Sequence, residues 1–136
     1  MILADTSAWI EFDRATGSSV DLRITDLVSN SGPLVVTEPV MMEIIAGARS
    51  EQHEYDLRRL LLRFDLLGFD AAIDFDGAAR LYRKCRLSGI TPRGMVDCMI
   101  ASVASRYEAS LLTFDADLIR IARVAQIDLD DASTSK

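Results

Sequence analysis

The chain opens with a short apolar run, Ile2-Leu3-Ala4, that ends at a carboxylate and two hydroxyls, Asp5, Thr6 and Ser7. An apolar run of this length, bounded by residues that cap helices, predicts a buried parallel strand. In open α/β sheets, ligand sites gather just outside the carboxyl ends of such strands. We therefore expect Asp5 at this edge, either as a plain helix cap or as part of a site, with Thr6 or Ser7 as the alternative cap.

Similar apolar runs recur along the chain. Leu34–Val36 and Ser110–Thr113 predict two more strands, and weaker signals fall at Leu66-Leu67 or residues 69–73, and at residues 127–129. Between them, apolar residues recur at helical spacing, with Thr37 expected as an N-cap; the helices are expected over residues 6–14, 20–28, 38–47, 50–64, 75–87, 96–106 and 118–122. Strands that alternate with helices predict an α/β fold with a mostly parallel sheet covered on both faces. We expect a single domain over residues 1–130 and a frayed polar tail over residues 131–136.

Composition excludes several kinds of protein. No apolar run approaches the roughly 20 residues of a membrane span, and the chain does not open with a signal-peptide pattern. Cys85 and Cys98 lack metal-type spacing, so reduced thiols in a cytoplasm are expected, with Cys98 in the core. The single histidine, His53, is expected to be exposed, and nothing places a nucleophilic Ser or Cys beside it. There is no Gly-rich phosphate-binding motif, and the net charge of −6 argues against a nonspecific polyanion binder.

Four acids are expected to converge at one edge of the sheet. Asp5 and Asp115 follow strands, Glu43 lies on the helix after the second strand, and Asp97 sits in an unusually apolar helix. Each could be an ordinary solvated acid, but carboxylates about 4 Å apart repel by roughly 1 to 4 kcal/mol unless a proton or a cation relieves them. Oxygen-only clusters suit Mg²⁺ or Mn²⁺. Such ions support phosphodiester hydrolysis, and this is the chemistry that the acids predict.

The motifs around these acids carry a resemblance over the whole chain. Asp5-Thr6-Ser7, the Glu38–Gly47 segment, Asp97–Ala101 and Leu112–Asp117 resemble PIN-domain ribonucleases, most closely the VapC toxins of bacterial toxin–antitoxin pairs. The resemblance implies a three-layer α/β/α sandwich and an endoribonuclease that depends on Mg²⁺ or Mn²⁺. It also implies a homodimer and a VapB-type antitoxin whose arginine-bearing tail enters the acidic pocket.

Carried over residue by residue, the resemblance implies roles for the acids and their neighbours. Asp5, Asp97 and Asp115 would be metal ligands, Glu43 a ligand directly or through water, and Asp117 a weaker candidate. Small polar residues would support the acids through hydrogen bonds, although plain helix capping is an equal alternative for Thr6; they are Thr6, Ser7 and Thr113.

Two further features have both a purely structural and a functional interpretation. Arg80, Arg83 and Arg93 fall in a stretch without acids, which could contact RNA phosphates or form a solvated helix face. The apolar positions on the Glu38–Gly47 helix and at residues 60–62 exceed what one buried face needs, and could pack in the core or bind an antitoxin helix. Trp9, Phe12 and Tyr55 are expected to be packing residues.

Three other classes of protein share some of these features. A phosphoacceptor signalling domain needs an acidic pair at the first strand and a Lys after a late strand, and neither Lys84 nor Lys136 is so placed. A phosphatase of the haloacid dehalogenase kind needs an acid where Ser7 stands. A catalytically silent PIN-like scaffold that only binds an antitoxin is the remaining alternative, and the intact acids argue against it.

Overall fold

A four-stranded, entirely parallel sheet forms the centre of the protein, as seen in a computed structural model that describes residues 1–135. The strands are β1 (Ile2–Ala4), β2 (Leu34–Val36), β3 (Asp65–Leu66) and β4 (Ser110–Leu112), in the order β3-β2-β1-β4. β1 pairs with β2 through Ile2 and Leu34 and with β4 through Leu3 and Leu111. β1 is therefore a central strand, and its carboxyl end lies between those of β2 and β4.

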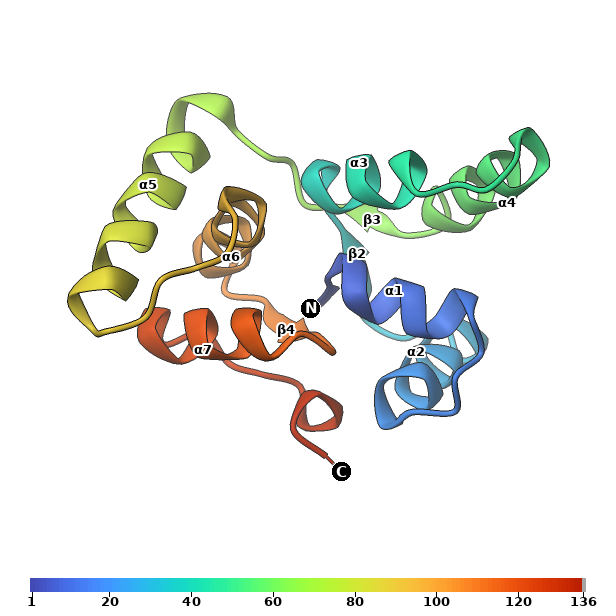
Figure 1. The fold of residues 1–136 in the computed structure, drawn as a ribbon. Coiled ribbons are helices and arrows are strands. Elements are labelled where there is room, and N and C mark those ends of the chain that lie inside the picture. The colour runs from blue at the N-terminus through green and yellow to red at the C-terminus, as the bar shows by residue number, and fades with distance from the viewer. Residues whose placement is uncertain (136) are drawn as a thin grey trace.

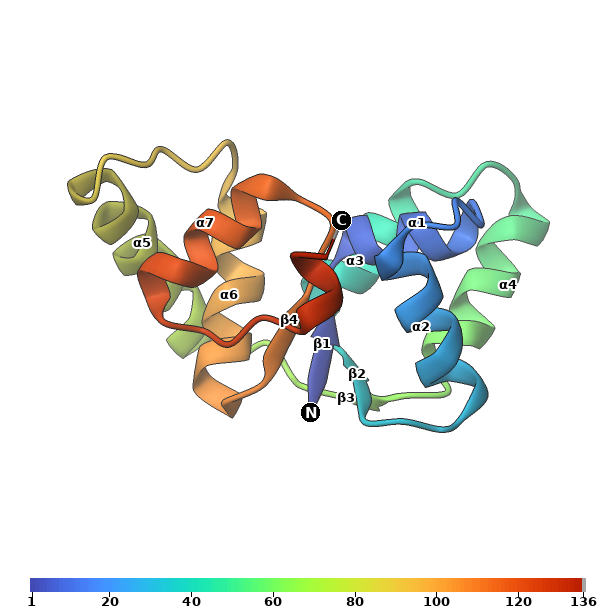
Figure 2. The same ribbon diagram turned by 90° about the horizontal axis from the view of Figure 1, so that it is seen from below.

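Helices cover the sheet on two sides. Figures 1 and 2 show α1 to α4 gathered on one side of the strands and α5 to α7 on the other. The helices are α1 (Thr6–Asp13), α2 (Ser19–Ser29), α3 (Glu38–Ala46), α4 (Glu51–Leu61), α5 (Ala71–Leu87), α6 (Met95–Tyr107) and α7 (Ala116–Ala125). The expected three-layer α/β/α sandwich is confirmed. None of the helices in residues 1–135 is long and apolar enough to cross a membrane.

The central strands owe their position to the absence of any polar side chain in them. Every residue of β1 and β2 is buried, and Leu3 and Ala4 are fully so. A strand buried on both faces must be apolar at successive positions, whereas a half-exposed strand alternates. Edge strand β3 shows the contrast, because both of its residues are exposed. It begins one residue before the first of the two predicted positions, Leu66-Leu67, and residues 71–73 of the second belong to α5 instead.

Side-chain caps begin most helices, but two of the expected caps differ. Asp5, not Thr6, caps α1, because its carboxylate accepts the Ala8 N–H. Thr37 occupies the N-cap position of α3, yet its hydroxyl makes no capping bond and is buried without a partner in residues 1–135. The local sequence signals both positions, but only the surrounding packing decides which oxygen reaches the helix end.

An ion pair between Asp74 and Arg106 joins α5 and α6, and no local sequence pattern predicts it. Asp74 is fully buried and accepts hydrogen bonds from the Arg106 guanidinium, at 2.6 Å from Nη2, and from the Ser102 hydroxyl at 2.8 Å. Burial raises the pKa of Asp74, but these donors and the Asp70 N–H outweigh it and lower the pKa below its ordinary value. Gly77 allows the two helices to approach closely, because a Cβ there would collide with Ser102.

The C-terminal segment differs from the expected frayed tail. Residues Asp131–Ser133 form a 3₁₀ helix that packs on α2 and β4. The Ser133 hydroxyl accepts the Thr113 N–H at 3.1 Å, so this segment supports the end of β4. Leu129 makes only an isolated bridge to Leu111, so the expected last strand is not formed. Lys136 lies outside the described residues.

Candidate active site

The structure brings all the predicted acids to the carboxyl edge of the sheet. Asp5 follows β1 directly, Asp115 is the N-cap of α7 after β4, and Asp97 lies in the first turn of α6. α3 begins directly after β2 and carries Glu43 to the same edge. Burial first, and then the charges of four neighbouring acids, raise the pKa of Asp97 to about 7; the four are Asp115, Asp5, Glu43 and Asp117. The expected convergence of the acids is therefore observed.

Asp5 is held by three donors from two segments, the start of α1 and the loop after β4. Its Oδ1 accepts the Ser7 hydroxyl at 2.7 Å and the Ala8 N–H at 2.9 Å, and its Oδ2 accepts the Thr113 hydroxyl at 2.7 Å. Burial raises the pKa of Asp5 to about 6, against these three hydrogen bonds, which lower it. A carboxylate has about four lone-pair sites, so three bonds leave one site for a cation. Asp5 thus caps α1 and also remains available as a ligand.

Ser7 and Thr113 form a small hydroxyl network around Asp5. Thr113 is fully buried, and its hydroxyl oxygen accepts the Asp115 N–H at 3.0 Å while its proton goes to Asp5. The Ser7 oxygen likewise accepts the Phe114 N–H at 2.9 Å. Each hydroxyl has a single proton, and both protons point to Asp5. The expected supporting roles of Ser7 and Thr113 therefore have a specific form: they join the end of β1 to the loop after β4.

Glu43 is linked to α1 through Thr6. The Thr6 hydroxyl donates a hydrogen bond to Glu43 Oε1, across 37 residues of sequence. Because Thr6 does not cap its helix, its hydroxyl is free to orient this more distant acid. The alternative that Thr6 is only a cap is therefore wrong.

Arginines already neutralise the outer acids. Arg93 places its guanidinium 2.7 Å from Asp115 Oδ1 and donates its backbone N–H to Asp117 Oδ2 at 3.1 Å. Asp117 is buried and also lies 3.3 Å from the Arg120 guanidinium. Of the five acids, Asp117 is the one that pairs with two arginines, Arg93 and Arg120.

The donor atoms suit a hard divalent cation, but in residues 1–135 they lie too far apart to coordinate one together. All five acids offer oxygen, the ligand type that Mg²⁺ and Mn²⁺ take. In residues 1–135 no three His, Cys, Asp or Glu side chains are arranged closely enough to hold a metal ion. Burial first, and then repulsion from the neighbouring acids, raise the pKa of Asp97, and a cation would relieve that repulsion. The residues therefore fit a cation chemically, and binding would draw the carboxylates closer together.

Arg80 and Arg83 do not join this cluster. Arg80 pairs with Asp76 one turn earlier on α5, and 81% of its side chain is exposed. Arg83 is exposed on the same helix. Their contacts correspond to a solvated helix face, whereas Arg93 lies on the acids themselves. Of the three predicted RNA contacts, the structure brings only Arg93 to the site.

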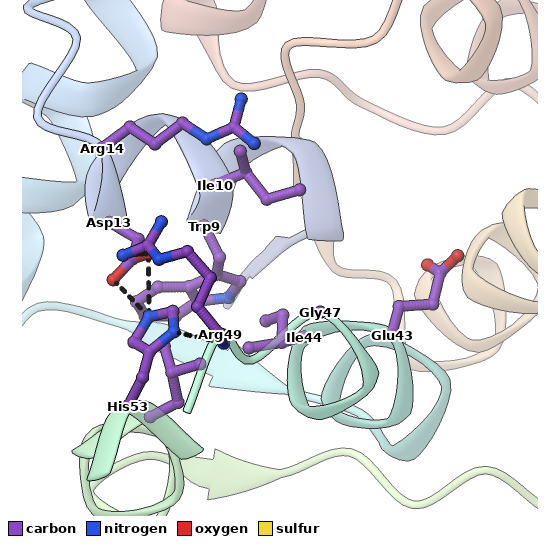
Figure 3. Close-up of a pocket in the computed structure, with 10 residues that line it drawn as sticks. Trp9, Ile10, Asp13, Arg14, Glu43, Ile44, Gly47, Arg49 and His53 are labelled. Atoms are coloured by element: carbon purple, nitrogen blue, oxygen red, sulfur yellow. Dashed lines mark hydrogen bonds and ion pairs between the residues drawn. The ribbon is translucent and has the colours of Figure 1, made fainter. Parts of the chain in front are cut away.

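A small cavity adjoins the acids between α1, α3 and the start of α4. Its walls include Trp9, Ile10, Glu43, Ile44 and Leu57. Figure 3 shows the Glu43 carboxylate pointing away from this cavity. The cavity is therefore a separate hollow beside the acidic cluster.

His53 helps to build this cavity and is not exposed as expected. Only 17% of its side chain is exposed, because Nε2 lies 3.0 Å from Asp13 and Nδ1 accepts the Arg49 N–H (Figure 3). Since Nδ1 accepts a bond, Nε2 carries the proton that is donated to Asp13. Asp13 and His53 are 40 residues apart, so no local pattern predicts their pairing. Trp9 packs against Phe12 and Phe64, as expected of a packing residue.

Fold and site together define a class: a small α/β/α domain with a carboxylate cluster where the strands of a parallel sheet end. The PIN domain matches residues 2–124, and the chain belongs to the PIN-domain family. It is 41% identical over 128 residues to VapC ribonuclease Mb1587 of Mycobacterium bovis, a match that covers 93% of this chain and 96% of the relative. Ribonuclease VapC11 of Mycobacterium tuberculosis matches with the same identity and coverage.

Solved structures share the fold at lower sequence identity. VapBC2 from Rickettsia felis, bound to a DNA fragment from the promoter, aligns with a TM-score of 0.74 at 21% identity, covering 96% of this chain and 98% of that one. DNA-bound VapBC from Salmonella typhimurium aligns with a TM-score of 0.73 at 21% identity, covering 95% and 96%. These matches confirm the architecture expected from the resemblance.

Proposed function

We propose that this protein is a toxin-type endoribonuclease that hydrolyses RNA phosphodiester bonds at the Asp5, Glu43, Asp97 and Asp115 cluster with a bound divalent cation. The observation that carries the proposal is the gathering of five acids where the strands end, at the starts of α1, α6 and α7 and on α3, with a pKa of Asp97 that burial first and then the other four acids raise to about 7. A fold has no need for such crowding, whereas a cation site does. The ribonuclease relatives supply the reaction class.

The chain's own residues have distinct roles in this proposal. Asp5, Asp97 and Asp115 would hold the cation, with Glu43 contacting it directly or through water, and Asp117 supporting the outer edge. A bound divalent cation supplies a polarised phosphoryl oxygen and a water of lowered pKa. Ser7 and Thr113 fix Asp5, so that little reorganisation is needed on binding. Arg93, whose side chain is 73% exposed, would contact the negative charge of the phosphate.

We propose Mg²⁺ as the working ion, with Mn²⁺ able to replace it. The donor set contains only oxygen, and the two thiols are buried and free rather than turned into the site. Mg²⁺ is commonly held by a few carboxylates together with water and a substrate phosphate. Zn²⁺, which favours nitrogen and sulfur ligands, should support less cleavage when the ions are compared at equal concentration.

The test is cleavage of RNA by the purified, partner-free protein. Cleavage should require Mg²⁺ or Mn²⁺ and stop on chelation, and Asp5→Ala and Asp97→Ala should lower the rate by at least about 100-fold. Circular dichroism should show that both variants remain folded, and Asp128→Ala provides a control, because its exposed carboxylate lies outside the cluster. Full activity of Asp5→Ala would refute the site. Folded wild-type protein without cleavage of any RNA would favour the silent scaffold.

We also propose that a VapB-type antitoxin inhibits the protein. The cavity beside Glu43 and the exposed Met42 on α3 offer apolar surface next to the acids. An amphipathic segment laid across this surface would bring a cationic residue to the carboxylates. Coexpression with the antitoxin encoded beside the gene should yield a complex without ribonuclease activity.

A homodimer and a cytoplasmic location, both expected from the sequence, stay predictions. Light scattering of the purified protein tests the first. The two free, buried thiols are compatible with the second, and cell fractionation tests it.

A further inference from the structure

We propose that Phe114 and Arg93 form a subsite for one unpaired nucleotide of the RNA, in which the ring of Phe114 stacks on the base and the guanidinium of Arg93 binds a phosphate. The proposal rests on the ribonuclease function proposed above and specifies part of its substrate: a single-stranded segment next to the acids.

Phe114 is an exposed aromatic ring with no stacking partner. It is 55% exposed, comparable to Tyr55 and Phe75, at 56% each. Those two rings have partners: Phe75 lies 4.9 Å from the ring of Phe69, and the Arg59 guanidinium lies over Tyr55 at 5.7 Å. Within residues 1–135, Phe114 makes neither kind of contact. Its exposed face therefore remains open to a ligand.

The backbone under Phe114 is fixed by the same network that holds Asp5. The Phe114 N–H donates to Ser7 Oγ at 2.9 Å. The residues on either side are fixed as well, because Thr113 donates its N–H to Ser133 Oγ at 3.1 Å and Asp115 donates its N–H to Thr113 Oγ1 at 3.0 Å. A ring on a fixed backbone loses little entropy when a base stacks on it. This loop is therefore a preorganised platform.

Arg93 supplies the positive charge with which the subsite would bind a phosphate. Its guanidinium lies 2.7 Å from Asp115 Oδ1, and Asp115 is the next residue after Phe114. Since 73% of the Arg93 side chain is exposed, a phosphate can approach the guanidinium without displacing protein atoms. Adjacent Cα atoms are about 3.8 Å apart, so the ring is carried by the residue next to the one that holds the guanidinium. An exposed aromatic ring and a cation on the same rim of the site are the groups that recognise the base and the phosphate of an unpaired nucleotide.

The first test separates binding from chemistry. With a single-stranded RNA that the wild type cleaves, Phe114→Ala should raise KM by about 5- to 150-fold, the effect of losing one stacked base, while kcat stays within about twofold. Phe114→Trp should restore the wild-type KM. Tyr55→Ala removes an equally exposed ring on α4 and should leave both constants unchanged. An unchanged KM in Phe114→Ala overturns the subsite.

The second test detects the stacked base directly and does not depend on cleavage. In the presence of EDTA, a 2-aminopurine-labelled RNA strand should lose fluorescence on binding wild-type protein and should keep it with Phe114→Ala. Arg93→Gln should lower the slope of log Kd against log salt by about 0.7, the value for one phosphate of a single strand. A duplex of the same sequence should bind Phe114→Ala and wild type equally.

The outcomes distinguish this subsite from the function on which it rests. If wild-type protein cleaves no RNA, the proposed function fails first. If wild-type protein cleaves but Phe114→Ala has an unchanged KM and quenches the probe normally, only the subsite fails. If Phe114→Ala instead weakens only antitoxin binding, the ring belongs to a protein interface and the subsite is overturned.

Discussion

Replacing Asp97 with Asn should stabilise the metal-free protein at pH 8. In the folded chain the pKa of Asp97 is raised from 3.8 to about 7, by burial first and then by the neighbouring acids. The folded state therefore binds more protons than the unfolded state between these two values. The free energy of unfolding falls as pH rises through this window, and the loss is complete above pH 7.

The magnitude follows from the size of the shift. About three pKa units correspond to about 4 kcal/mol. Asp97 is partly exposed, so solvent screening should reduce the gain to about 1 to 2 kcal/mol. For a chain of 136 residues, this amounts to a rise in Tm of about 4 to 7 °C.

The assay is thermal unfolding followed by circular dichroism in EDTA, from pH 4 to pH 8. The advantage of Asp97→Asn should be absent near pH 4, grow with pH and level off above pH 7. Asp128→Asn, which removes an exposed carboxylate, should show no such trend. Adding Mn²⁺ at pH 8 should raise the Tm of the wild type more than that of Asp97→Asn. A variant that is destabilised equally at every pH would refute the electrostatic reasoning and leave a purely structural role for Asp97.

Three further predictions use other contacts. Arg106→Ala should lower the free energy of unfolding by about 3 to 5 kcal/mol, because it leaves the fully buried Asp74 carboxylate without its cationic partner; urea unfolding measures this, and Arg80→Ala, which breaks an exposed ion pair on α5, should cost less than about 1 kcal/mol. Thr113→Val should lower the free energy of unfolding by about 1 to 3 kcal/mol. The Thr113 hydroxyl lowers the pKa of Asp5 in the wild type, so its loss should raise that pKa and shift Mn²⁺ binding to higher pH; calorimetry at several pH values should detect the shift. In wild-type protein, Mn²⁺ affinity should rise steeply between pH 5 and 8, as Asp5 and Asp97 lose protons at about 6 and 7; a flat profile would contradict both pKa shifts.

The sequence alone predicted the features that depend on residues close to one another in the chain. The three apolar runs became β1, β2 and β4, because a buried parallel strand needs nothing but consecutive apolar side chains. Because these strands are parallel and in contact, the acids that follow them meet at one edge, and Asp5 and Asp115 could be placed there in advance. Glu43 and Asp97 could be placed with them, because their helices start at that edge.

Tertiary structure decided what each side chain does once the segments meet. Asp5 and Thr6 were both plausible caps of α1, and the choice fell to Asp5 because Thr6 reaches Glu43 across 37 residues. The His53–Asp13 pair and the Asp74–Arg106 pair span 40 and 32 residues, so no local pattern signals them. Hydrogen bonds and burial depend on atoms that are distant in the chain. The sequence therefore determined which acids gather, and only the fold determined how they are held, neutralised and exposed.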